Sequence, residues 1–143
     1  MARMLALLII LLSFTSNCYA QSTLVIDDIV MGDRITGMIK ASGIDAAQSC
    51  VVVYIRTNHW YIHPYAAAGE DQSWASINGN AWSIPTLRRG VAANAVAALL
   101  LRKDKTGGCA APAEIEDVAL VDRRVGVPFL KQLRPGDAWY GRL

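Results

Sequence analysis

Residues 50–65, with the sequence CVVVYIRTNHWYIHPY, constrain the fold more than any other stretch of the chain. Dense β-branched and aromatic runs favour strands. Residues 50–56 are predicted to form a strand whose side chains alternate between two faces. The core-facing set is Val51, Val53 and Ile55, and the opposite set is Val52, Tyr54 and Arg56. Thr57-Asn58 predicts a hairpin turn, after which residues 60–65 return antiparallel.

Much of the remaining chain has the pattern of short strands between turn residues. Further strands are expected in the ranges 24–26, 29–31, 34–40, 73–77, 81–84 and 118–121. Asn78-Gly79-Asn80 is a strong hairpin signal between two of them. Residues 91–101 are apolar on every side, so a buried central strand and a helix of about three turns both fit. We expect the strand, because its neighbours are strands.

The predicted fold class is all-β, as an Ig-like or related antiparallel β-sandwich that allows one short C-terminal helix. Pro128 suits the first position of that helix, over residues 129–133. The 143 residues correspond to one domain, and 53% hydrophobic residues favour a packed core over disorder. No linker divides residues 21–143, which are expected to form a single domain.

Residues 1–20 have the layout of a cleavable secretory signal. A basic start is followed by the apolar run 5–12 and by small residues at the end. This run is too short to span a bilayer, which needs about 20 residues. We expect cleavage after Ala20 and a periplasmic or secreted protein without membrane insertion. A retained anchor is one alternative, and lipidation of Cys18 is another, although the residues before it lack the usual lipoprotein pattern.

Loss of Cys18 with the signal would leave Cys50 and Cys109 as an even pair. In an oxidising compartment a disulfide is expected between them, with two separate buried thiols as the alternative. Without a neighbouring Cys-x-x-Cys the pair makes a poor zinc site, so no metal or cofactor is expected. The formal net charge is +2 with both signs mixed along the chain, which disfavours nucleic-acid binding.

One sheet surface is the candidate binding face, if the two strands of residues 50–65 pair as a hairpin. Its expected members are Tyr54, Arg56, Tyr61, His63 and Tyr65. A planar aromatic row suits sugar rings or the surface of a partner protein. The alternative is that these tyrosines only support cross-strand pairs. The core is the expected place of Trp60, Trp74 and Trp82.

Catalytic chemistry has little support in the sequence. His59 and His63 lie four residues apart, which in a strand is about 13 Å and too far for two ligands of one ion. There is no Gly-x-Ser-x-Gly motif, and Glu70 and Asp71 are adjacent rather than placed across a cleft. A non-enzymatic role is expected. A small hydrolase that uses His59, His63 and Glu70 is a remaining alternative.

Several short motifs within residues 33–102 carry a resemblance to a known type of module. They are Val53-Tyr54-Ile55, Trp60, Pro64, Ser73-Trp74, Asn78-Gly79-Asn80-Ala81-Trp82 and Thr86. The chain resembles a small secreted bacterial β-sandwich module with V-x-V-Y-I, G-W-x-x-x-P and D-G-x-W patterns. That module usually accompanies extracellular or polysaccharide-associated proteins. The resemblance implies an extracytoplasmic accessory domain and brings no catalytic residues.

Two partner classes follow as hypotheses. The first is a polysaccharide or other envelope polymer, bound through the aromatic face. The second is an envelope protein, with the chain acting as an interaction or assembly subunit through an edge strand near Pro64 or through the C-terminal aromatic tail.

Overall fold

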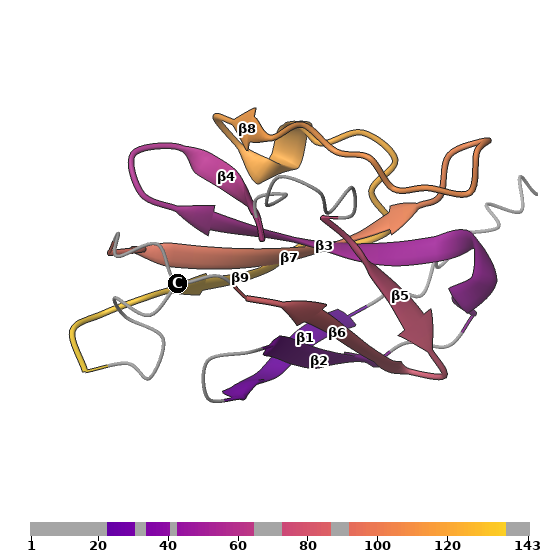
Figure 1. Ribbon diagram of the computed structural model, residues 1–143, viewed down its shortest axis with the longest axis horizontal. Coiled ribbons are helices and arrows are strands. Elements are labelled where there is room, and N and C mark those ends of the chain that lie inside the picture. Colours follow the sequence, from indigo (N-terminus) through magenta and orange to yellow (C-terminus); the bar gives the residue numbers. More distant parts are fainter. Residues whose placement is uncertain (1–22, 31–33, 41–42, 65–72, 87–91, 137–143) are drawn as a thin grey trace, which may run out of the picture.

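The computed structural model describes residues 23–30, 34–40, 43–64, 73–86 and 92–136, the first range by its backbone (Figure 1). Their strands are β1 (Thr23–Val30), β2 (Arg34–Lys40), β3 (Ser49–Arg56), β4 (Trp60–His63), β5 (Ala75–Asn78), β6 (Ala81–Pro85), β7 (Ala95–Arg102), β8 (Glu114–Ile115) and β9 (Phe129–Gln132). Two 3-10 turns are also described, η1 (Ala46–Gln48) and η2 (Val118–Leu120). The predicted all-β antiparallel, sandwich-like fold is confirmed.

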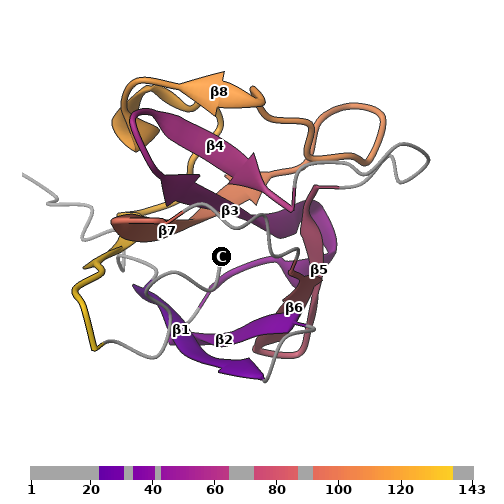
Figure 2. The ribbon, with the colours of Figure 1, turned by 60° about the vertical axis from the view of Figure 1, so that its left-hand side comes forward.

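Two groups of antiparallel strands form the sandwich. One group has the order β1-β2-β6-β5, and the other has β8-β4-β3-β7-β9. β5 belongs to both, because it pairs with β6 at one end and with Cys50 and Val51 of β3 at the other. Figure 2 shows β5 running between the lower strands and the central pair β3 and β7.

β3 and β7 are the centre of the fold, since they pair along their whole length from Ser49↔Arg102 to Arg56↔Ala95. In each strand every residue except the terminal arginine is buried. Strands covered on both faces carry continuous apolar runs rather than an alternating pattern. The strand predicted for residues 91–101 is therefore confirmed, with bounds shifted to those of β7.

The first core lies between the two groups of strands. Its central members are Val51, Val53, Ile55, Val96, Ala98 and Leu100 from β3 and β7, with Ile35, Ile39, Trp82 and Ile84 from β2 and β6. The alternation of β3 puts one set of its side chains here, as predicted. Trp82 is a core residue, also as predicted, and is 2% exposed.

A second core lies on the other face of β3 and β7. It contains Cys50, Val52, Tyr54, Ala95, Ala97, Leu99 and Leu101 of these strands, and Trp60 and Ile62 of β4. Residues 103–128, here called the covering segment, close this core with Cys109, Val118 and Val121. Trp74 packs against the same core while partly buried. The face of β3 that was expected to be a surface is thus interior.

The predicted disulfide between Cys50 and Cys109 is confirmed, with a Cα–Cα separation of 6.5 Å. It joins β3 to the covering segment, and both residues are fully buried. Hydrogen bonds add further attachments. The Tyr54 hydroxyl donates to the carbonyl of Pro112 at 2.7 Å, and the amide of Ile62 donates to the carbonyl of Ala113 at 2.9 Å.

The start of the covering segment is ordered by Asp104. The hydroxyl of Thr106 donates to its carboxylate at 2.5 Å, and the amides of Thr106 and Gly108 donate to the same oxygen. These hydrogen bonds lower the pKa of Asp104, the Thr106 hydroxyl contributing most. Farther along, the Arg123 guanidinium donates to the carbonyls of Ala110 and Arg102 at 2.6 and 3.2 Å. The segment is held by polar contacts although it has little regular structure.

The turn residues of the sequence predicted the ends of strands correctly in one place and wrongly in another. The predicted hairpin at Asn78-Gly79-Asn80 is confirmed, because Asn78 pairs with Ala81 and Gly79 has φ of +61°. The run expected at 24–26 and the described part of the run expected at 29–31 form one strand, β1, whose pairing with β2 shifts register between Ile26 and Asp28. A β-bulge accommodates such an extra residue without ending the strand.

Two predicted elements are wrong. Residues 129–133 were expected to be helical, but β9 pairs with β7 from Ala98↔Phe129 to Ala95↔Gln132. The unpaired edge of β7 satisfies the backbone of this segment better than an isolated helical turn would. Residues 118–121 were expected to be a strand, but Asp117 accepts a hydrogen bond from the amide of Ala119 at 2.8 Å and starts η2.

Helical structure in the described residues is limited to the two 3-10 turns. Within the same ranges no helix has the length and apolar character needed to cross a bilayer. The predicted secretory signal, residues 1–20, and Cys18 within it lie outside the described residues.

Candidate functional site

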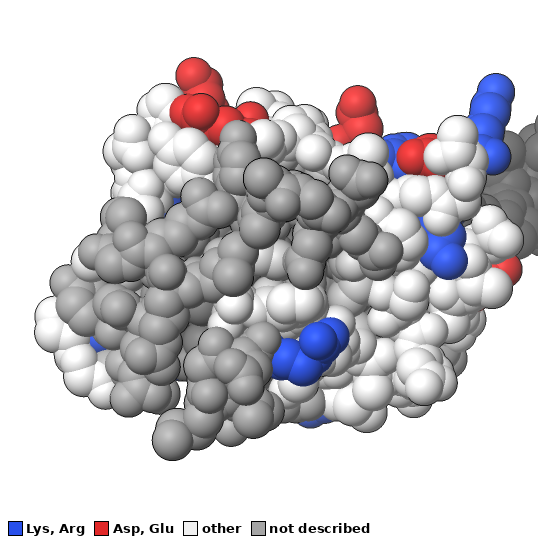
Figure 3. Space-filling model, viewed as in Figure 1, with Lys and Arg blue, Asp and Glu red and all other residues white. Residues whose placement is uncertain are grey.

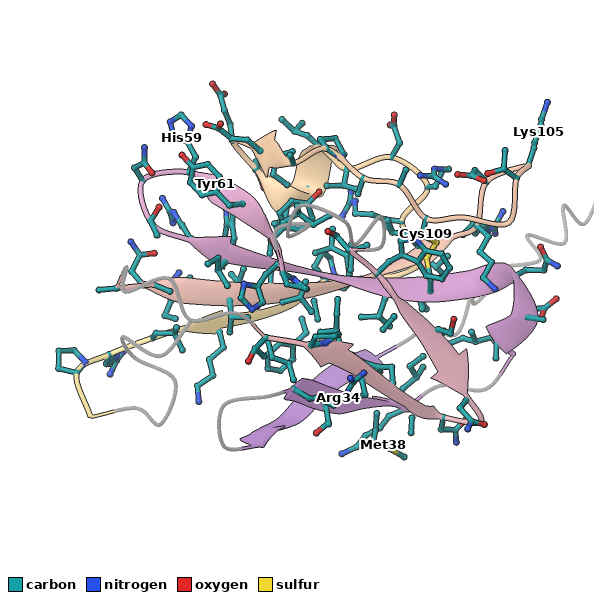
Figure 4. The ribbon with its side chains drawn as sticks, viewed as in Figure 1. Arg34, Met38, His59, Tyr61, Lys105 and Cys109 are labelled. Carbon is teal, nitrogen blue, oxygen red and sulfur yellow. A yellow bond between two sulfur atoms is a disulfide. The ribbon has the colours of Figure 1, made fainter. Side chains whose placement is uncertain are left out.

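An exposed group of polar and aromatic side chains lies where the β3–β4 connection meets β8. It consists of Asn58, His59, Tyr61 and Glu114, here called the Tyr61 cluster. β8 places Glu114 directly opposite Tyr61, because the two are register partners in the β4–β8 pair. His59 lies two residues before Tyr61 and therefore on the same side of the chain. Figure 4 shows His59 and Tyr61 together at one end of the molecule, far from Lys105.

Short contacts hold the Tyr61 cluster together. Nδ1 of His59 and Oε1 of Glu114 are 2.5 Å apart, and their side chains are 48% and 52% exposed. The Tyr61 hydroxyl donates to Oδ1 of Asn58 at 3.2 Å and lies 3.5 Å from Oε1 of Glu114. The rings of His59 and Tyr61 have centroids 6.5 Å apart and planes 14° from parallel. The result is two nearly parallel rings beside a carboxylate and an amide.

This arrangement offers two kinds of contact to a ligand. Aromatic rings provide flat apolar area, and sugar rings have apolar faces that stack on such area. Glu114 and Asn58 provide hydrogen-bond acceptors beside the rings, and the amide is also a donor. The cluster therefore combines flat apolar area with hydrogen-bonding groups at one exposed place.

The His59–Glu114 pair also resembles the imidazole–carboxylate pair of a catalytic triad. A triad needs a serine or cysteine nucleophile within hydrogen-bond reach of the imidazole. The described contacts of His59 are with Glu114 and Tyr61. They supply no such nucleophile, and Glu70, the carboxylate of the hydrolase hypothesis, lies outside the described residues.

The predicted binding face is not present as one surface. Tyr54 is fully buried, and His63 is 1% exposed, so neither is available to a ligand. Arg56 is exposed but lies over the Trp60 ring, with Cζ 5.8 Å from the ring centroid. Tyr61 is half-buried and packs against the first core. Tyr65 lies outside the described residues.

One residue in the connection after β3 explains the error. A two-residue turn at Thr57-Asn58 would have paired Arg56 with His59. The observed connection has three residues, so Arg56 pairs with Trp60 and Tyr54 pairs with Ile62. A shift of one residue moves every side chain of a strand to the other face. Tyr61 therefore lies on the side opposite to Tyr54.

Tyr54 is instead a polar core residue with a marked pH signature. Burial raises its pKa from 10.0 to about 12. The stability linked to this raised pKa is fully present below about pH 10 and is lost as pH rises towards 12, because the unfolded chain ionises first.

We expect Tyr54→Phe to be less stable than the wild type by about 1 kcal/mol at pH 7, since the hydrogen bond to Pro112 is lost. The difference should shrink by pH 11, where only the wild type is destabilised by ionisation of this hydroxyl in the unfolded chain. Urea unfolding of both proteins at the two pH values measures this. Parallel pH profiles would contradict it.

The structure also places Pro64, near which the sequence had suggested an assembly contact, and the two histidines, whose spacing had argued against a metal site. Pro64, the expected place of an edge contact, is itself buried at the end of β4. His59 precedes β4 and His63 ends it, one exposed and the other buried. In the part of the chain that the structure describes, no three His, Cys, Asp or Glu side chains gather as a possible metal site.

Three members of the Tyr61 cluster were absent from the predicted binding face. His59 could have been included, because alternation along a strand puts it beside Tyr61. Asn58 was assigned only to the turn. Glu114 is 53 residues from Tyr61 in sequence and reaches it through the β4–β8 pairing, for which the sequence contains no local signal.

Comparisons of the chain with protein-family models, with curated proteins and with solved structures find no match.

Proposed function

We propose that the protein is an exported, non-enzymatic binding module that recognises a glycan or another envelope polymer through the Tyr61 cluster. The observation that carries the proposal is the pair of nearly parallel rings, His59 and Tyr61, with the Glu114 carboxylate beside them. Export is supported by the secretory pattern of residues 1–20 and by the buried Cys50–Cys109 disulfide, which suits an oxidising compartment.

The geometry favours a ring-shaped, hydroxyl-rich ligand. The Tyr61 ring is fixed on one side by packing against the first core, so little conformational freedom is lost when a ligand stacks on it. The His59 ring is oriented by its contact with Glu114. Rings that are already oriented bind a flat partner at a lower entropic cost.

We expect Tyr61→Ala to weaken binding to a recognised polysaccharide about tenfold, which corresponds to about 1.4 kcal/mol. Tyr61→Phe should keep most of the affinity, because the ring remains. His59→Ala should also weaken binding, and its exposed position makes a folding defect a poor explanation. Pull-down of residues 21–143 on insoluble polysaccharides, peptidoglycan included, measures the bound fraction.

Lys105→Ala is the matched control, because this exposed residue lies at the other end of the molecule (Figure 4). It should bind like the wild type. Wild-type affinity in both Tyr61→Ala and His59→Ala would remove the cluster from consideration. A wild-type protein that binds none of the polymers would reject glycan binding itself.

A further inference from the structure

A groove of about 470 Å³ crosses the outer face of β2, β5 and β6, away from the Tyr61 cluster. Strand alternation puts most of its lining on the face opposite the core, since Ile35, Ile39 and Ile84 of the same strands point inward. The groove is lined by Thr36, Gly37, Met38, Ser76, Asn78, Ala81, Trp82 and Ser83. Half of these residues carry a hydroxyl or amide group, and most of the others are small or apolar.

Arg34 is held at one end of this groove. Its Nε donates to Oγ of Ser83 at 2.5 Å, and its Nη2 donates to the carbonyl of the same residue at 3.1 Å. Ser83 lines the groove, so the guanidinium is fixed beside it. A guanidinium has five N–H donors, of which these two bonds use two. The remaining donors have the fork geometry that binds a carboxylate through two hydrogen bonds.

The charged residues of the three strands that line the groove are basic. β2, β5 and β6 contain Arg34 and Lys40 and no acidic residue. In Figure 3 the described acidic side chains lie mainly along the upper edge, and the lower part of the view shows Lys and Arg without Asp or Glu. Arg34 supplies positive charge at one end of the groove, which favours an anionic ligand over a cationic one.

We propose that the groove binds a carboxylate-bearing sugar, with the carboxylate on Arg34 and the sugar hydroxyls on the polar lining. Ser76 and Asn78 provide donors and acceptors that hydroxyl groups need. Met38 is 37% exposed and gives an apolar surface for a sugar ring. Few polar groups of fixed orientation in a concave surface are typical of ligand sites.

The test uses oligogalacturonate, a uronic acid oligosaccharide, and its neutral methyl ester as the matched ligand, with calorimetry on residues 21–143. We expect the acid to bind at least about tenfold more tightly than the ester. Arg34→Gln should remove this preference, and Arg34→Lys should retain part of it, since charge remains without the fork. Higher salt should weaken binding of the acid. Lys105→Ala should resemble the wild type.

Equal affinity for acid and ester, or unchanged binding in Arg34→Gln, would overturn the assignment. Binding of poly-glutamate as tight as that of the oligosaccharide, and equally dependent on Arg34, would remove sugar as the ligand class. If Tyr61→Ala abolishes binding of the acid while Arg34→Gln does not, the ligand lies on the Tyr61 cluster. That outcome rejects the groove site and leaves the proposed function standing.

Discussion

Replacing Cys50 and Cys109 together by alanine is expected to lower the free energy of unfolding by about 4 kcal/mol. The two residues are 59 positions apart, and the loss of a cross-link over a loop of this length increases the entropy of the unfolded chain. Both sulfurs are in the second core, so a small loss of packing adds to the effect. Chemical denaturation under oxidising conditions measures the difference.

A reductant provides the internal control for the disulfide. The wild type in reducing buffer should lose a similar amount of stability, whereas the double variant should not respond. Equal unfolding midpoints for the oxidised wild type and the double variant would show that the cross-link contributes nothing. A response of the double variant to reductant would show that the effect has another origin.

Leu99→Ala is expected to destabilise the protein by about 3 kcal/mol. Leu99 is 1% exposed and belongs to the second core, between β7 and the covering segment. Truncation of Leu99 leaves a cavity, because the closely packed strands β3 and β7 cannot move to fill it. The expected size of the effect depends on the covering segment being packed against these strands rather than lying loosely over them.

Leu130→Ala is the matched control for this substitution. Leu130 pairs with Ala97 and faces the same side of the sheet as Leu99, but it is 52% exposed. Its truncation should cost less than about 1 kcal/mol. Urea unfolding of the three proteins compares them directly. Similar losses for both variants would mean that the second core is not closed by residues 103–128.

The predicted strands succeeded where periodicity and turn chemistry agreed. β2 follows alternation, and the β5–β6 hairpin follows the glycine at position 79, which is in the left-handed region. β3 was predicted from its β-branched and aromatic run, and β7 from an apolar run between neighbouring strands. Their burial on both faces could not be predicted, because the covering segment that provides the second layer has almost no regular structure.

In the candidate site, some residues could be predicted from the sequence and others could not. Tyr61 was singled out from the sequence, and its neighbour His59 was within reach of the same reasoning. Glu114 was not, because it comes from a two-residue strand whose position depends on pairing with β4. Tyr54 was wrongly placed beside Tyr61, since a connection one residue longer than predicted reverses the faces.

The groove beside Arg34 depends entirely on tertiary structure. Its lining comes from β2, β5 and β6, and the sequence alone does not indicate that β6 separates β2 from β5. The Arg34–Ser83 contact joins residues 49 positions apart. Clusters of this kind need long-range pairing, which local patterns do not encode.

From its sequence alone this chain could be assigned to the all-β class, to a fold centred on residues 50–56 and to a Cys50–Cys109 pair. Strand propensity, alternation and the number of cysteines are local or compositional properties, so they can be read from the sequence without knowledge of the fold. Which face of β3 is covered, and which side chains meet around Tyr61 and Arg34, was decided only by the tertiary structure. The physical reason is that register and layer order are set by contacts between distant segments, and one residue in one connection is enough to exchange interior and surface.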